Sequence, residues 1–298
     1  MLTLRVVSRR VRRAIKSRLG VGRDRFNKNK INLQAALAAG QEFIDLMPGI
    51  DLPMVIHPKM YFTVGYTNYV FEQETLDFIR DHLRTGDTFL DIGANVGYLS
   101  LFCANLVKQS CRVIAFEPGE FAFDLLKKNK DLNQFDNLEI YNAGLGEKDE
   151  IVQFNTGMPG MEVYNSVGKI VHPSADAEKF HTISAKFYKG STWLKRHNVD
   201  KIDIMKLDVE GGEYLVLKGM HEIFQAQKVS RLLIEITDEM SRALGYHPSD
   251  IIYMLSDCGY EWFTLHSCGR LKPLLDKSLR NAPRDTHMFV AVAPPQRK

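Results

Sequence analysis

Acidic residues that follow apolar runs are the positions in this chain best suited to chemistry. Asp208 and Glu210 come directly after the apolar run 202–207, which contains Lys206. A carboxylate there can remove a proton from a hydroxyl or orient it, and a lysine can stabilise a developing alkoxide. We therefore predict Asp208, Glu210 and Lys206 as catalytic residues. The alternative for Glu210, and also for Glu213, is to stabilise the start of the following helix. For Lys206 the alternative is a structural ion pair.

A second group of residues indicates a nucleoside-like cofactor. Residues 88–100 predict a short buried strand ending at Asp91, a turn through Gly93 and Gly97, and a following helix. Glycine tolerates a positive φ in a tight turn and lacks the Cβ that would keep the backbone away from a ligand. The next apolar run ends at Glu117, where an acid can accept hydrogen bonds from a ribose diol.

The spacing of the glycines separates the nucleoside cofactors from one another. A dinucleotide site requires Gly-x-Gly-x-x-Gly, whereas this chain has Asp91-x-Gly93-x-Asn95-x-Gly97. This pattern resembles the first motif of class I S-adenosylmethionine-dependent methyltransferases. A nicotinamide- or flavin-dependent enzyme is the alternative, and Glu117 disfavours a bare strand-turn-helix without a ligand.

Several motifs together resemble the FkbM family of methyltransferases from about residue 66 to residue 292: Gly86-Asp87, Asp91-Ile-Gly-Ala-Asn-Val-Gly97, Ala115-Phe-Glu-Pro118, Asn142-Ala-Gly-Leu-Gly146 and Lys206-Leu-Asp-Val-Glu-Gly211. The resemblance implies an α/β fold, with a Rossmann-like, doubly wound, mostly parallel seven-strand sheet whose last strand is antiparallel. It implies S-adenosylmethionine as methyl donor and O-methylation of a sugar, glycan or secondary metabolite. It also implies a set of cofactor-binding residues: Asp91, Gly93, Ala94, Asn95, Gly97, Glu117, Asn142 and Ala143.

Two further groups of residues leave alternatives open. Asp208, Glu210, Glu235 and Asp238 could bind a hard divalent cation through oxygen ligands, but acids at strand ends recur without metals, so we assign no metal ligand. An insertion at about 155–200 matches no part of the family pattern and is rich in Gly, Pro, Ser and His. His172 and His181 within it could act as bases from a lid, although a histidine in a polar loop is usually only solvated. The acceptor is therefore left open.

Apolar periodicity predicts the elements that position these residues. Strands are expected over about 88–91, 111–116, 138–142, 202–208, 232–236, 262–266 and 287–292, with a basic loop around 270–272. Helices are expected over about 31–47, 71–83, 98 onward, 120–132, 213–220 and 248–255, with an extended segment over 54–64. Alternating strands and helices predict a mostly parallel sheet covered on both faces. We expect an N-terminal segment over 31–65 and a methyltransferase domain over 66–294.

The first 30 residues differ in charge from the rest of the chain. They carry eleven Lys or Arg residues and one acid, whereas the other 268 residues have a net charge of −7. Apolar residues recur there at helical spacing, at Leu4, Val7, Val11, Ile15 and Leu19. The pattern predicts a basic amphipathic helix suited to an anionic membrane surface. A solvated tail and a targeting segment are alternatives, and nucleic acid is disfavoured because no aromatic residue precedes Phe26.

The cysteines and the apolar runs bear on the location of the protein. The four cysteines form no C-x-x-C pair, which argues against a zinc ribbon and a disulfide framework. We therefore expect a reducing compartment, the cytoplasm, with membrane association through the basic tail as an addition. No apolar run approaches the roughly 20 residues that span a bilayer. The sequence leaves the oligomeric state open.

Overall fold

The computed structural model of this chain describes residues 40–60, 70–107, 110–167, 177–279 and 288–295. The basic tail expected over residues 1–30 and His172 lie outside these ranges. No helix within them is long and apolar enough to cross a membrane.

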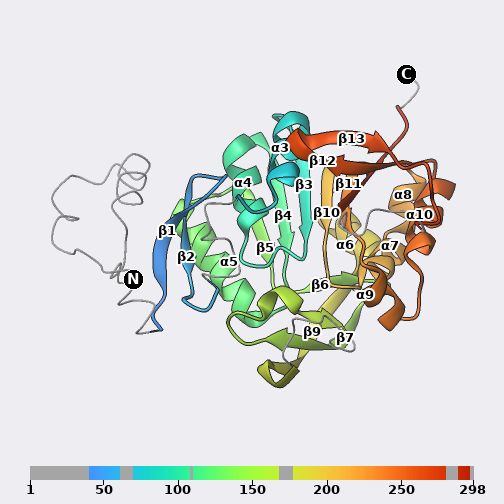
Figure 1. Ribbon diagram of the computed structural model, residues 1–298. Helices are drawn as coiled ribbons and strands as arrows, with labels where there is room; N and C mark the ends of the chain where they lie inside the picture. The colour runs from blue at the N-terminus through green and yellow to red at the C-terminus, as the bar shows by residue number, and fades with distance from the viewer. Residues whose placement is uncertain (1–39, 61–69, 108–109, 168–176, 280–287, 296–298) are drawn as a thin grey trace.

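A central sheet of eight strands forms the framework of the molecule, in the order β13-β12-β14-β11-β10-β3-β4-β5 (Figure 1). Its parallel strands are β3 (Thr88–Ile92), β4 (Arg112–Phe116), β5 (Leu138–Tyr141), β10 (Ile202–Leu207) and β11 (Val229–Glu235). Strand β14 (Met288–Val292) lies antiparallel between β11 and β12 (Glu261–His266). The expected doubly wound, mostly parallel sheet with an antiparallel last strand is confirmed, but it has eight strands where seven were expected. Strand β13 (Arg270–Pro273) extends the edge where a basic loop was predicted.

Helices cover both faces of this sheet. Three contribute buried residues to the same hydrophobic cluster: α3 (Gln73–His82), α4 (Tyr98–Val107) and α5 (Glu120–Asn133). The others are α6 (Gly190–Arg196), α7 (Glu213–Gly219), α8 (His221–Gln225), α9 (Asp238–Ala243) and α10 (Pro248–Asp257). Successive residues of a strand point to opposite faces, so Val113 and Ala115 belong to one buried cluster and Ile114 and Phe116 to the other. Burial on both faces explains why these strands are continuous apolar runs.

An antiparallel hairpin of β1 (Phe43–Met47) and β2 (Leu52–Ile56) precedes α3. The prediction of a helix reaching Met47 is therefore wrong for residues 43–47. The cause is tertiary: Gly49 allows a tight turn with φ of +82°, and β2 packs on α5, where Asn129 Oδ1 accepts a hydrogen bond from the Val55 N–H at 2.6 Å. The extended segment predicted over 54–64 is confirmed for residues 54–56 in β2, residues 58–60 form a turn instead, and residues 61–64 lie outside the described ranges.

The unassigned insertion forms most of a second sheet. Its four strands are β6 (Gly144–Gly146), β9 (Phe180–Lys189), β7 (Glu150–Gly157) and β8 (Ser166–Val167), paired in that order. Short 3-10 turns, η2 (Glu162–Tyr164) and η3 (Ala177–Lys179), lie in the connection between β7 and β9. In Figure 1 this second sheet lies below the central sheet. The insertion is thus an ordered part of the molecule in its described residues.

Candidate functional site

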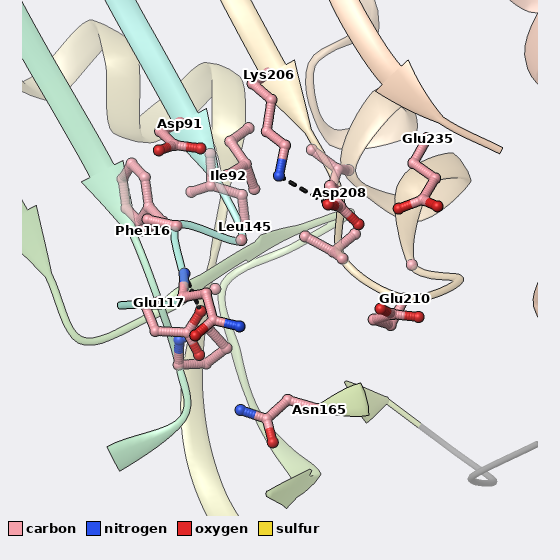
Figure 2. Close-up of a pocket in the computed structure, with 18 of the residues that line it drawn as sticks. Asp91, Ile92, Phe116, Glu117, Leu145, Asn165, Lys206, Asp208, Glu210 and Glu235 are labelled. Carbon is pink, nitrogen blue, oxygen red and sulfur yellow. Dashed lines mark hydrogen bonds and ion pairs between the residues drawn. The ribbon is translucent and has the colours of Figure 1, made fainter. Parts of the chain in front are cut away.

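A cavity of about 1060 Å³ lies between the carboxyl ends of the central parallel strands and the second sheet. Residues after β3, β4, β10 and β11 form one wall, and residues of β7, β8 and β9 form another. Figure 2 shows Asp91, Glu117, Lys206, Asp208, Glu210 and Glu235 arranged around it. Ligands of open α/β sheets bind at this edge, where the strands end.

Both glycines of the predicted turn have positive φ, and each is needed for packing. A Cβ added to Gly93 (φ +84°) would lie 1.8 Å from the backbone oxygen of Asp208, so Gly93 lets β3 and β10 end side by side. A Cβ on Gly97 (φ +91°) would lie 2.4 Å from Leu126 Cδ1 of α5. Gly97 does not line the cavity, whereas Gly93, Ala94 and Asn95 do. The missing Cβ atoms of these glycines were expected to let the backbone approach a ligand. In the structure they let the turn pack against β10 and α5.

Asp91 and Glu117 lie at the ends of adjacent strands, as the sequence predicts. Asp91 is 1% exposed; its Oδ2 accepts a hydrogen bond from the Ser100 hydroxyl, while its Oδ1 has no partner. Glu117 Oε2 accepts from the Asn95 N–H at 2.9 Å and Oε1 accepts from the Gly119 N–H at 2.8 Å. Burial raises the pKa of Glu117 to about 7 despite these bonds.

Lys206 and Asp208 form an ion pair at the end of β10. Lys206 Nζ lies 2.7 Å from Asp208 Oδ2, and Lys206 is 5% exposed. Burial tends to lower the pKa of Lys206, but the charges of Asp208 and Glu72 outweigh it and the pKa lies above its ordinary value. Burial tends to raise the pKa of Asp208, and Lys206 outweighs that effect, so this pKa is lowered. Both groups are ionised at neutral pH.

Two neighbouring carboxyl groups, those of Glu235 and Glu210, have raised pKa values instead. The negative charge of Asp208, followed by burial, raises the pKa of Glu235 to about 10, and the two carboxyl groups are hydrogen-bonded. Burial, followed by the charge of Asp208, raises the pKa of Glu210 to about 9. Glu210 has a left-handed φ of +53° in the turn after β10. Glu210 and Glu235 therefore carry their protons at neutral pH.

Glu213 stabilises the turn after β10 that contains Glu210. Its Oε1 accepts hydrogen bonds from the N–H groups of Val209 and Gly211, each at 3.1 Å, and the Tyr246 hydroxyl donates to its Oε2 at 3.2 Å. Burial raises the pKa of Glu213 to about 7. Glu213 does not line the cavity, in agreement with the structural alternative for this residue.

Some residues predicted for the site lie outside the cavity. Asn142 and Ala143 do not line it; the Asn142 Nδ2 donates to the Glu117 carbonyl at 2.9 Å, and the following residues Gly144 and Leu145 face the cavity instead. Asp238 forms an exposed pair with Arg242. His181, on β9, is exposed and does not line the cavity. Within the described ranges no three His, Cys, Asp or Glu side chains are placed to hold a metal ion.

The structure adds lining residues that the sequence did not single out. Glu72, before α3, has a φ of +47° and a buried Oε2 without a partner, and burial raises its pKa. Glu162 and Asn165 reach the cavity from the insertion. None of these residues belongs to a local motif, and only the folded second sheet and the turn before α3 place them at the site.

Comparisons with known proteins give a consistent result. A family model described as the methyltransferase FkbM domain matches residues 91–262. Hexuronic acid methyltransferase AglP of Haloferax volcanii is 27% identical over 228 residues, 73% of this chain and 86% of that protein. Methyltransferase 1 of Beauveria bassiana is 28% identical over 149 residues, 46% of this chain and 59% of that protein, so the match spans less than two thirds of the latter. A solved methyltransferase FkbM from Methylobacillus flagellatus KT aligns over 70% of this chain and 44% of that chain, with 17% identity and a TM-score of 0.42.

Proposed function

This chain belongs to the FkbM family of methyltransferases, and we propose that it methylates a hydroxyl group of a sugar, glycan or secondary metabolite. Family membership confirms methyl transfer and S-adenosylmethionine as the cofactor, both expected from the sequence. The nicotinamide-dependent alternative is not favoured. The volume of the cavity, about 1060 Å³, lies just above the roughly 300–1,000 Å³ of typical small-molecule pockets. It can therefore hold a cofactor and an acceptor together.

The polar atoms of the wall near β3 and β4 fit S-adenosylmethionine. Asp91 Oδ1 and Asn95 Oδ1 are buried, lack partners and belong to lining residues. Carboxylate and amide oxygens accept hydrogen bonds from ammonium and hydroxyl groups, both of which the cofactor carries. We assign the methionine portion and ribose to Asp91, Gly93, Ala94 and Asn95, and the ribose diol to Glu117. When bound, the cofactor supplies an activated methyl group on a sulfonium.

Gly97, Asn142 and Ala143 take supporting positions in this account. Gly97 allows the start of α4 to pack closely on α5. The Asn142 Nδ2 donates hydrogen bonds to the carbonyls of Glu117 and Pro118, which fixes the backbone at these two residues. These contacts hold Glu117 at the wall of the cavity. The three residues therefore act on the cofactor site through its shape.

Asp208 is the residue that we assign as general base. A hydroxyl is a weak nucleophile while it keeps its proton, and a positioned base contributes typically about 10²- to 10⁴-fold. Lys206 keeps Asp208 ionised and fixes its orientation through the 2.7 Å contact. As the acceptor oxygen becomes an ether, its proton passes to Asp208. Glu210, which is protonated at neutral pH, orients the acceptor by donating a hydrogen bond.

The observation that carries this proposal is the ionised Lys206–Asp208 pair on the same cavity as Glu117. The likeness to a hexuronic acid methyltransferase supports a sugar as acceptor. To test it, the purified chain is incubated with S-adenosylmethionine carrying a deuterated methyl group and with fractionated glycans and metabolites. Mass spectrometry should find one labelled methyl group on an oxygen of one fraction. A labelled methyl group on nitrogen or carbon would overturn O-methylation. Consumption of the cofactor with no labelled product in any fraction would overturn methyl transfer to these acceptors.

A further inference from the structure

The second sheet contributes a buried amide that no role described above uses. Asn165 lies between η2 and β8, is 8% exposed and lines the cavity. Its Oδ1 accepts a hydrogen bond from the Gly157 N–H at 2.7 Å, which fixes the orientation of the amide. Its Nδ2 is buried and has the Glu117 carboxylate as its neighbour. An amide nitrogen carries two N–H donors, so Nδ2 can face Glu117 and still donate to a ligand.

Asn165 Nδ2 lies beside the carboxylate of Glu117. In Figure 2 the Asn165 side chain approaches from the second sheet with its nitrogen on the side of Glu117. A Cβ added to Gly119 would lie 2.4 Å from Asn165 Nδ2 and 2.8 Å from Glu117 Oε1, so both atoms border the same small space. A hydrogen bond from the Asn165 side chain lowers the pKa of Glu117, against the larger effect of burial. A donor and an acceptor thus converge from two different sheets.

A vicinal diol requires this combination. Each ribose hydroxyl can donate one hydrogen bond and accept others, whereas a carboxylate only accepts and an amide nitrogen only donates. We infer that Asn165 is a second ribose-binding residue, donating from Nδ2 to a hydroxyl whose proton is directed at Glu117. The inference rests on the proposed role of Glu117. It makes the second sheet part of the cofactor site as well as a wall of the acceptor site.

Asn165→Asp separates this role from a purely structural one. Aspartate keeps an oxygen that accepts from the Gly157 N–H, and so keeps the contact that orders the turn. It replaces the donor by a second acceptor and places a negative charge beside Glu117. A role confined to the turn therefore predicts little change. A ribose-binding role predicts a loss of affinity that partly remains in Glu117→Gln, where the charge repulsion is absent.

The experiment is calorimetric titration of the full chain with S-adenosylhomocysteine. We expect Asn165→Asp to weaken binding by about tenfold or more, the range for hydrogen bonds that involve a charged group. The control is Asn155→Asp: Asn155 lies on β7, its Oδ1 accepts from the Thr182 hydroxyl, and it does not line the cavity. The control should bind as the wild type does. Wild-type affinity of a folded Asn165→Asp variant would overturn the inference.

A double-mutant cycle tests whether Asn165 and Glu117 act on the same group. Glu117→Gln alone should weaken binding, and the loss caused by Asn165→Asp should be smaller in that background because the charge repulsion is gone. A loss that disappears completely in the Glu117→Gln background would assign the effect of Asn165→Asp to charge repulsion with Glu117 and overturn the inference, while the role of Glu117 would stand. Unchanged affinity of Glu117→Gln alone would instead overturn the ribose assignment itself.

Gly119→Ala provides a test if Asn165→Asp does not fold. Gly119 precedes α5 with a φ of −73°, which any residue adopts, so alanine brings no backbone strain. Its Cβ would separate the Asn165 amide and Glu117 Oε1, since it would lie within 3 Å of both. We expect weaker binding of S-adenosylhomocysteine at an unchanged melting temperature. Binding as tight as that of the wild type would contradict the inference.

Discussion

The carboxyl groups around Lys206 differ in protonation state, and this difference assigns them different roles. Lys206 lowers the pKa of Asp208, whereas the charge of Asp208 and burial raise those of Glu235 and Glu210 to about 10 and about 9. An ionised carboxylate can accept a proton, while a protonated one can only donate a hydrogen bond. The sequence placed Asp208 and Glu210 together as possible bases. Their electrostatic surroundings favour Asp208.

Asp208→Asn should separate catalysis from cofactor binding. We expect kcat to fall by about 10²- to 10⁴-fold, because asparagine cannot take the proton. The dissociation constant of S-adenosylhomocysteine should change little, because we assign the ribose and methionine contacts to other residues. Asp238→Asn is the control, since Asp238 pairs with Arg242 at the surface. A kcat for Asp208→Asn within a few-fold of wild type would exclude Asp208 as the base.

The pKa of Glu117 predicts a pH dependence of cofactor binding. Its folded-state pKa is raised to about 7, so the carboxylate is mostly ionised at pH 8 and mostly protonated at pH 6. If the ribose diol donates to the ionised form, affinity for S-adenosylhomocysteine should fall by up to about tenfold as the pH drops from 8 to 6. Titrations in Glu117→Gln should be weaker and should lack this dependence. The same slope in wild type and variant would assign it to another group.

At the scale of elements, the site depends on how closely β3 and β10 end beside each other. Gly93 permits this contact because its missing Cβ leaves room for the backbone oxygen of Asp208. The Asp208 N–H in turn donates to the Ile92 carbonyl at 3.1 Å. The turn after β3 and the acid after β10 are therefore one packed unit. Any residue at position 93 that separates the two strands moves both walls of the cavity.

Gly93→Ala and Gly245→Ala form a matched pair for this claim. Both glycines have a φ of +84°, but a Cβ on Gly245 meets nothing within 4 Å. Gly245→Ala should cost about 1–2 kcal/mol of unfolding free energy from backbone strain alone. Gly93→Ala should cost a further 1–3 kcal/mol or so from overpacking and should weaken S-adenosylhomocysteine binding. Urea denaturation of both variants checks this, and equal losses would contradict the packing role.

The strand ends that carry the site could be predicted from the sequence. Buried parallel strands are continuous apolar runs, and the polar residue that ends each run falls at one edge of the sheet. Asp91, Glu117 and Asp208 were located in this way. The segment 43–47 was wrongly predicted as helix, because its short apolar run suits a helix or a strand and its pairing with β2 decides between them.

Other parts of the site depend on contacts that no local pattern encodes. Glycine is required at position 93 because β3 and β10, which are far apart in the sequence, end in close contact. Asn165 reaches Glu117 only because β7 and β9 pair and carry the intervening turn to the cavity. Asn142 belongs to a family motif, yet its side chain turns to backbone carbonyls instead of the cavity. The sequence therefore predicts the site residues at the carboxyl edge of the central sheet, but not those that the second sheet contributes on the opposite side of the cavity.

At the scale of the whole molecule, two sheets enclose one cavity and the charges of the chain are segregated. Residues beyond position 30 have a net charge of −7, and the first 30 carry eleven basic residues. We propose that this tail contacts an anionic membrane surface while the cavity acts independently of it. Such an arrangement would hold the enzyme near a lipid-linked acceptor.

Deleting residues 1–30 tests this division. The truncated chain should bind S-adenosylhomocysteine as the full chain does, because no assigned site residue lies in the deleted segment. Its association with vesicles containing phosphatidylserine should be lost at low salt, and that of the full chain should weaken as salt rises. Sedimentation of both chains with vesicles provides the measurement. Equal vesicle binding by the two chains would remove the membrane role of the tail.

The central claim is that one cavity holds S-adenosylmethionine against an ionised Asp208. The most direct measurement is calorimetric titration of S-adenosylhomocysteine and of NAD into the wild type, Glu117→Gln and Asp208→Asn at pH 8. The account predicts one site per chain for S-adenosylhomocysteine, weakened in Glu117→Gln and preserved in Asp208→Asn, and no comparable binding of NAD. Absence of S-adenosylhomocysteine binding by the wild type, or tighter binding of NAD, would contradict it.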